Sequence, residues 1–242
     1  TAVLAVLLSS LALGWCIVEL NMMTGDRALR GTLQLDTFEI TACTAVLYVG
    51  AGFSALFCHF PSEHFGRRAT LLTCDVLFIA GSLLCVASNS VTLIFVGRAV
   101  IGVGAGAALT VVPALLAEIA PAPQRGVVGF AHTCAITLGS WLCAICGSCL
   151  VTYVDGGWRG IFLGLWVFGT LQLLLAHLVP ESPRWLARQR GVAAALHMLG
   201  TIRPKGTPEA KLLLEIPPDD GGQSATVSPD ELRALSRPIS IG

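Results

Sequence analysis

Charge is the property that this sequence has least of. Only 12% of the 242 residues are charged, whereas 54% are hydrophobic. Soluble domains carry about a quarter charged residues, so this chain has too few charges to cover a globule of its size. Its apolar surface must face something other than water, and lipid is the simplest answer. The chain has 15 lysine and arginine residues and 15 aspartate and glutamate residues. It therefore lacks the excess of basic residues that would indicate a nucleic acid partner.

Marks of a secreted protein are also scarce. Two asparagines occur, Asn21 and Asn89, and neither begins an Asn-x-Ser/Thr glycosylation acceptor. The chain starts inside an apolar run without a methionine or a charged leader, so we expect a fragment or a processed start. All nine cysteines lie in apolar stretches, and we interpret them as small packing residues rather than a disulfide framework.

Long apolar runs dominate what is present. A helix crosses the hydrocarbon core with about 20 apolar residues. Such stretches are found at Ala2–Met23, Phe38–Phe60, Thr70–Ser88, Val91–Ala117, Val127–Val151 and Trp158–Val179. The runs are too long for strands and lack polar/apolar alternation. The sequence therefore predicts an all-α membrane protein, with a six-helix bundle in residues 1–180 and a polar, partly helical cytoplasmic segment in residues 181–242.

Arginine placement predicts the orientation of the bundle. One side holds Arg67, Arg68, Arg125, Arg184, Arg188 and Arg190, and the other side holds Arg27, Arg30 and Arg159. Loops rich in lysine and arginine stay in the cytoplasm. We therefore expect the loops after the second, fourth and sixth stretches to be cytoplasmic. In the polar segment, Ser228-Pro229-Asp230-Glu231 has the pattern of a helix start.

Away from the ends of the apolar stretches, three charged residues stand in their interiors, namely Glu19, Asp75 and Arg98. A charge within a span is costly and usually faces a cavity or a partner. Arg98 could have such a partner, or it could snorkel to the outer interface. Glu19 or Asp75 could belong to a proton relay, while Asp75 could instead be solvated from the inner interface near Arg67 and Arg68.

Two groups of residues have spacings similar to those of cofactor-binding motifs. Gly97, Gly102, Gly104 and Gly106 follow no strand, so we interpret them as helix-packing positions and not as a dinucleotide loop. Cys143-x-x-Cys146-x-x-Cys149 has a spacing seen in iron–sulfur ligation but lacks a fourth cysteine nearby. We expect no metal, no cofactor and no enzymatic activity.

Polar residues form two further groups. His132, Thr133, Ile136, Thr137 and Ser140 share a face of the fifth stretch, which could hydrogen-bond to another helix or line a solute path. At the inner surface, acids and bases alternate at neighbouring helix ends. Salt bridges there would hold these ends closed, at about 0–1 kcal/mol for each exposed pair. The alternative is a set of topology signals on a solvated surface.

At these residues the sequence resembles the sugar-porter branch of the major facilitator superfamily. The matching segments are Phe65-Gly66-Arg67-Arg68, Gly97-Arg98 with Gly102, Pro113-x4-Glu118-Ile119-Ala120-Pro121-x3-Arg125-Gly126, Gly157-Trp158-Arg159 and Pro180-Glu181-Ser182-Pro183-Arg184-Trp185-Leu186. They span residues 1 to about 190, and the last is the most specific. Related organic-ion carriers share part of this pattern.

The resemblance implies two six-helix bundles joined by a cytoplasmic helical segment, with substrate held between them near the membrane centre. This chain would be the N-terminal half of a carrier for a hexose-like solute, needing a second half that is covalent or separate. The implied cytoplasmic gate comprises Glu63, Arg67, Arg68, Glu118, Arg125, Glu181 and Arg184. The implied substrate path comprises Trp15, His132, Thr133, Ile136, Thr137 and Ser140.

Departures from the family pattern leave alternatives open. Thr133 stands where the family has a sugar-binding glutamine. Cys16 stands where proton-coupled members have an aspartate, which favours facilitated diffusion, although Glu19 one turn later could substitute. The alternatives are a carrier for organic ions or another small solute, and a non-transporting half that regulates a full-length carrier.

Overall fold

The computed structural model describes residues 2–23, 36–154, 156–191, 194–195 and 198. Contacts divide the chain into two units, Thr1–Ser182 and Pro183–Gly242. In the described part of the second unit, α9 (Pro183–Arg190) buries Leu186 against Ala195. The predicted boundary after residue 180 stays a prediction. The helix start at Ser228, with Arg27 and Arg30, lies outside the described residues.

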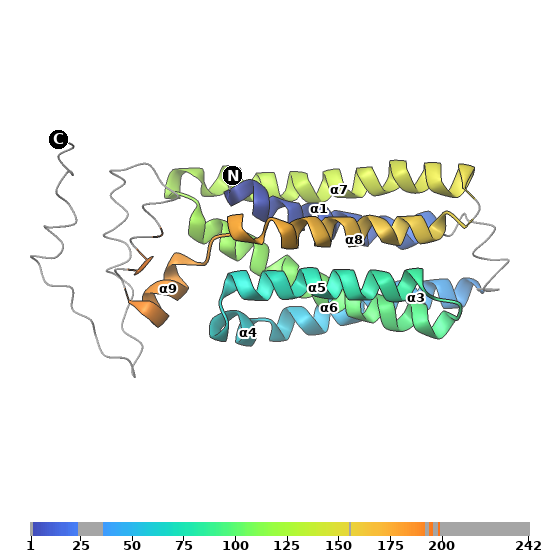
Figure 1. Cartoon of the computed structure of the whole chain (residues 1–242), viewed down its shortest axis with the longest axis horizontal. Helices are drawn as coiled ribbons and strands as arrows, with labels where there is room; N and C mark the ends of the chain where they lie inside the picture. The colour runs from blue at the N-terminus through green and yellow to red at the C-terminus, as the bar shows by residue number, and fades with distance from the viewer. Residues whose placement is uncertain (1, 24–35, 155, 192–193, 196–197, 199–242) are drawn as a thin grey trace, which may run out of the picture. The chain divides into compact units, whose positions relative to one another are not determined.

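Six long helices run side by side in the described part of the first unit (Figure 1). They are α1 (Ala2–Met23), α3 (Thr37–Phe57), α5 (Arg67–Val86), α6 (Val91–Ile119), α7 (Arg125–Tyr153) and α8 (Trp158–Leu174). All regular structure in the described ranges is helical. The predicted all-α membrane fold is therefore confirmed.

Two predicted stretches end earlier than expected. The second breaks at Cys58 into α3 and the short α4 (His59–His64), because Pro61 has no N–H to continue the hydrogen-bond ladder. The sixth is α-helical only through Leu174, and a 3₁₀ turn (Ala176–Leu178) follows. Among the residues that the structure describes, five helices are long and apolar enough to cross a membrane, and α8, with 17 residues, is a shorter apolar helix. It lies at the lower limit for a span.

Glycines set how closely the central helix α6 approaches its neighbours. Gly102 and Gly106 lie against the backbone of α3 at Leu47 and Ala51, where a Cβ atom would collide with a carbonyl oxygen. On another side of α6, Gly97 meets Gly81 of α5 in the same way. Close approach of backbones is how helices associate in lipid. The packing interpretation of the glycine cluster is thus confirmed.

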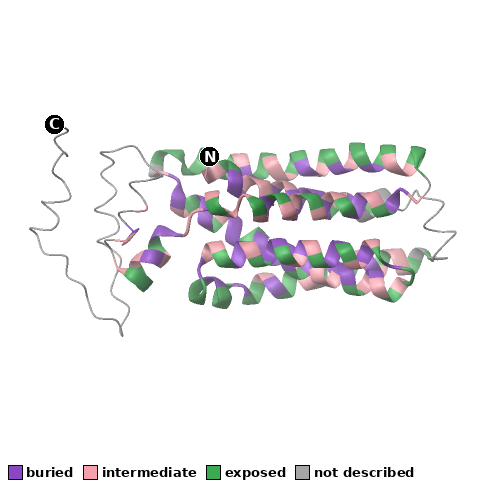
Figure 2. Ribbon diagram, viewed as in Figure 1, coloured by how far each residue is buried: buried purple, intermediate pink, exposed green. Residues whose placement is uncertain are grey.

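Burial is uneven around the bundle. The apolar windows of α3 and α7 are only 17% and 22% buried, and Figure 2 shows the outer side of α7 exposed along its length. Six of the nine cysteines are buried, as expected for packing residues, but Cys134, Cys146 and Cys149 are exposed on α7. They lie on faces of α7 that no described residue covers.

Candidate functional site

A tight crossing of α1 and α7 fixes which side of α7 faces inward. Gly139 lies against the backbone of α1 at Leu11, and Gly14 lies against the backbone of α7 at Ile136. A side chain at either glycine would overlap the opposite helix. The Gly139 side of α7 is therefore held inward, and the opposite side faces away from the bundle.

Two of the predicted path residues join these helices. His132 is buried, and its Nδ1 lies 2.8 Å from the Ser10 hydroxyl of α1. The Ser140 hydroxyl lies 3.0 Å from the Gly14 carbonyl, its acceptor on α1. The sequence allows two interpretations of this face of α7, hydrogen bonding to another helix or lining of a solute path. For His132 and Ser140 the structure shows hydrogen bonding to another helix.

Other predicted path residues face outward. Thr133 and Thr137 are exposed, and their hydroxyls donate to carbonyls of their own helix. Ile136 is half-buried beside them. At about 100° per residue, Thr133, Thr137 and Ser148 form one stripe, and Leu138, Leu142 and Ile145 form an apolar stripe beside it. The exposed Ser148 and Trp141 were missed, although their spacing from Thr137 places them on or next to the polar stripe.

Trp15 lies elsewhere. Its ring is buried, and its Nε1 donates to the Ile161 carbonyl of α8 at 2.9 Å. The rings of Trp15 and Phe168 make an edge-on contact, with their centroids 5.4 Å apart. Gly164 of α8 leaves room for this ring. The contacts of Trp15 are thus with α8, which places it apart from the polar stripe of α7 and gives it a packing role between α1 and α8.

The intramembrane charges are not equivalent. Arg98 of α6 donates from Nη1 to Glu19 of α1, and both side chains are fully buried. Arg98 therefore has a partner and does not snorkel. Asp75 of α5 is also fully buried, and neither of its carboxyl oxygens has a hydrogen-bond partner among the described residues. Solvation of Asp75 from the nearby helix end is excluded by its burial.

At one end of the bundle, charged groups connect the helix termini. Arg67 Nε lies 3.9 Å from Glu118 Oε1 at the end of α6, and Arg67 Nη1 donates to the Ser62 carbonyl at 2.8 Å. This pair is mostly shielded, with 18% and 12% of the side chains exposed. It ties α5 to α6 and to α4.

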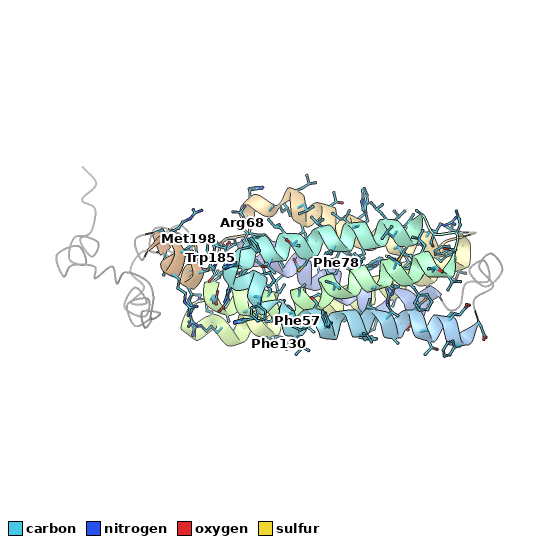
Figure 3. The ribbon with its side chains drawn as sticks, turned by 90° about the horizontal axis from the view of Figure 1, so that it is seen from below. Phe57, Arg68, Phe78, Phe130, Trp185 and Met198 are labelled. Atoms are coloured by element: carbon cyan, nitrogen blue, oxygen red, sulfur yellow. The ribbon has the colours of Figure 1, made fainter. Side chains whose placement is uncertain are left out.

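A second set of contacts ties α5 to the segment after α8. Glu181 accepts from the backbone N–H of Arg68 at 3.1 Å, while the Arg68 guanidinium donates to the Ala176 carbonyl at 3.1 Å. Gly66, with φ +95°, lies against the Glu181 carboxylate, where a side chain would not fit. We call Arg67, Arg68, Glu118 and Glu181 the helix-end latch, and Figure 3 labels Arg68 at that end of α5.

Three predicted gate residues are not part of the latch. Glu63 lies on α4, 3.3 Å from His59 of its own helix. Arg125 is exposed at the start of α7, and Arg184 is exposed on α9 in the second unit. The structure thus brings together four of the predicted gate residues. Glu181 joins the latch by accepting from the backbone N–H of Arg68. The alternation of acidic and basic residues in the sequence could not have predicted a contact with a backbone group.

Residues 13–233 match the family model described as sugar (and other) transporter. The chain belongs to this family. It is 34% identical over 179 residues to myo-inositol transporter 3 of Cryptococcus neoformans var. grubii, covering 74% of this chain and 30% of that protein. It is 36% identical over 155 residues to the glucose transporter GlcP of Staphylococcus epidermidis, covering 62% of this chain and 32% of that protein. The predicted sugar-porter resemblance is confirmed, and the relatives are transporters, not enzymes.

Solved structures agree on the fold. The proton:xylose symporter XylE, of the major facilitator superfamily, bound to 6-bromo-6-deoxy-D-glucose, superposes with a TM-score of 0.75 and 24% identity, covering 87% of this chain and 50% of that chain. The inward open conformation of XylE from E. coli gives a TM-score of 0.73. The chain therefore spans about a third of the curated relatives and about half of these structures.

The Ser10–His132 contact gives a first testable expectation. Replacing Ser10 by alanine should lower the free energy of unfolding by about 1 kcal/mol, because it removes one interhelical hydrogen bond within the membrane. Thermal unfolding of the purified chain measures the loss. Thr44→Val is the matched control, since the Thr44 hydroxyl bonds only within its own helix. Equal losses in the two variants would contradict a role for Ser10 in joining α1 to α7.

Proposed function

We propose that this chain is the N-terminal half of a carrier that moves a sugar-like solute across a membrane by alternating access. The observation that carries the proposal is the exposed polar stripe of Thr133, Thr137 and Ser148 on α7, a helix long and apolar enough to cross a membrane, in a member of the sugar transporter family. Both threonine hydroxyls donate to carbonyls of their own helix and stay exposed, so their oxygens can still accept a hydrogen bond from a solute.

The chemistry of the solute follows from this stripe. Relatives of the chain are named for myo-inositol and glucose, which are ring compounds rich in hydroxyl groups. Threonine and serine hydroxyls both donate and accept hydrogen bonds. A solute hydroxyl buried without a partner costs about 1–3 kcal/mol. Thr133 and Thr137 would therefore supply the polar contacts, and Ile136 would supply one apolar wall.

A second six-helix half, either part of the same chain or a separate chain, would cover the exposed apolar surface of this bundle. Such a surface is offered by α3 and α7, whose apolar windows are the least buried of the five spanning helices in the described residues. We place the end with the helix-end latch in the cytoplasm, following the arginine bias of the sequence.

The helix-end latch suits a gate. The latch consists of one ion pair, 3.9 Å long, and of single hydrogen bonds that involve charged groups. Such a hydrogen bond contributes about 1.5–3 kcal/mol, so only a few contacts have to break for this end to open. Glu63 and Arg125 would join it when the second half is in place, and the assignment of Arg184 to the gate stays a proposal. We propose facilitated diffusion as the mode of transport. The specific observation for the alternative, proton coupling, is the buried Glu19–Arg98 pair.

Uptake of labelled solutes tests this function. The full product of the transcript that contains this segment should take up D-glucose or myo-inositol when expressed in cells. Thr133→Val should raise the KM for the solute about 5- to 10-fold, because one hydroxyl contact of roughly 1 kcal/mol is lost. Thr73→Val, an exposed threonine on α5, is the matched control and should leave KM unchanged.

Other outcomes would overturn the proposal. Uptake of tetraethylammonium without uptake of sugars would assign the protein to organic-ion carriers. Absence of both activities, with co-purification of a full-length carrier, would assign it a regulatory role. A third outcome is uptake that requires an inward proton gradient and loses this requirement in Glu19→Gln. That result would show proton-coupled transport instead of facilitated diffusion.

A further inference from the structure

The interface between α5 and α8 holds two buried polar side chains without partners. Asp75 is 0% exposed and Gln172 is 1% exposed. Neither carboxyl oxygen of Asp75, and neither polar atom of the Gln172 amide, has a hydrogen-bond partner among the described residues. Buried polar groups in membrane interiors are costly when left unpaired. The missing hydrogen bonds of these two side chains therefore need a physical explanation.

The packing of the two helices places these two residues on the sides of α5 and α8 that face each other. A Cβ atom on Gly169 of α8 would lie 3.1 Å from the Asp75 carbonyl, so the helices cross there. Gln172 follows three residues later, on the same side of α8. Figure 3 labels Arg68 and Phe78, which bracket Asp75 along α5.

The directions of α5 and α8 strengthen this convergence. Arg68 at the start of α5 donates to Ala176 beyond the end of α8, and Arg159 at the start of α8 donates to Ser88 beyond the end of α5. The helices are therefore antiparallel. Side chains lean toward the N-terminus of their own helix, so Asp75 leans toward the level of Gln172, and Gln172 leans toward the level of Asp75.

Hydrogen-bond capacity distinguishes the two forms of the Asp75 carboxyl group. An ionised carboxylate only accepts, so it would leave the Gln172 carbonyl oxygen facing it without a donor. A protonated carboxyl group can donate from its O–H to the Gln172 Oε1 and accept from the Gln172 Nε2 on its other oxygen. The protonated form would therefore satisfy all four open atoms and place no net charge on Asp75.

Charged neighbours do not serve Asp75 instead. Arg67 faces Glu118, the Arg68 guanidinium faces the Ala176 carbonyl, and Arg98 is paired with Glu19. The charged and titratable groups on the surrounding elements are Arg67, Arg68, Cys74 and Cys85 on α5; His59, Glu63 and His64 on α4; Arg98 and Glu118 on α6; and Arg159, His177 and Glu181 on or beyond the ends of α8. None of these groups pairs with Asp75.

We propose that Asp75 and Gln172 form a proton-binding site, in which a protonated Asp75 and the Gln172 amide make a neutral acid–amide pair that joins α5 to α8. The site is separate from the Glu19–Arg98 pair. The same two helices carry the Arg68–Ala176 contact of the helix-end latch, so the proton on Asp75 stabilises the packing beneath the latch. This inference is independent of the transported solute.

Infrared spectroscopy of the whole chain in lipid nanodiscs at neutral pH tests the site. The wild-type protein should show a carboxylic-acid C=O band that shifts in D₂O and disappears in Asp75→Asn, while Glu19→Gln retains it. Gln172→Leu should move this band to higher frequency, because the hydrogen bond to the acid is lost. Thermal unfolding should show a Tm about 3 °C lower for Gln172→Leu, whereas the exposed control Gln124→Leu should be unchanged.

Three results would overturn the proposal. The first is a spectrum in which Asp75→Asn removes no protonated carboxyl band. The second is a Gln172→Leu variant whose Asp75 band stays at the wild-type frequency, a readout that remains usable if Asp75→Asn fails to fold. The third is a Tm that rises with sodium but not with choline and loses this dependence in Asp75→Asn, which would make the occupant a sodium ion.

Discussion

Replacing Arg98 by methionine should lower the free energy of unfolding by about 3–5 kcal/mol. This is the usual cost of removing one partner of a buried ion pair, because the other charge is left uncompensated. Glu19 and Arg98 are both fully buried, and their pair is the charged contact between α1 and α6. Unfolding of the purified chain, followed by circular dichroism in a denaturing detergent titration, measures this loss.

A double-mutant cycle separates this pair from general packing. Glu19→Leu combined with Arg98→Met should recover most of the stability lost in either single variant, since no unpaired charge then remains. Arg125→Met is the matched control, because Arg125 is exposed at the start of α7 and should tolerate the change. If the two single losses simply added in the double variant, the proposed coupling between Glu19 and Arg98 would be refuted.

The bundle itself could be predicted because lipid imposes simple rules on length and composition. Every predicted apolar stretch contains a long helix, whereas Arg67 and Arg68, expected in the turn before the third stretch, form the first residues of α5. Helix ends were less predictable. Pro61 divided one predicted stretch, and α8 changed to a 3₁₀ turn after Leu174. Such local endings depend on single backbone groups that hydrophobicity does not encode.

The candidate site was only partly predictable. Thr133 and His132 are adjacent in sequence, yet one is exposed and the other is buried against Ser10. The rotation that separates them is set by Gly139 packing on α1, which a single helix cannot reveal. Glu19 and Arg98 were recognised as costly charges, but 79 residues separate them in the chain and only the fold pairs them.

Adding one methyl group at Gly106 should be the second largest perturbation. Gly106 of α6 lies against the Ala51 carbonyl of α3, and an added Cβ would overlap that backbone atom. Backbone cannot move aside as a flexible side chain can, so α3 and α6 must separate. Gly106→Ala should therefore lower the free energy of unfolding by about 2–3 kcal/mol, despite a helix-propensity gain of about 1 kcal/mol. Thermal unfolding of the purified chain provides the measurement.

Gly52→Ala on α3 is the matched control, since an added Cβ there meets nothing within 4 Å. This variant should keep or slightly raise the stability through helix propensity alone. A further variant tests the cause of the loss. Ala51→Gly added to Gly106→Ala should not restore stability, because the collision is with the backbone carbonyl of residue 51 and not with its methyl group. Full recovery in that double variant would show that side-chain crowding, rather than backbone approach, sets the distance between α3 and α6.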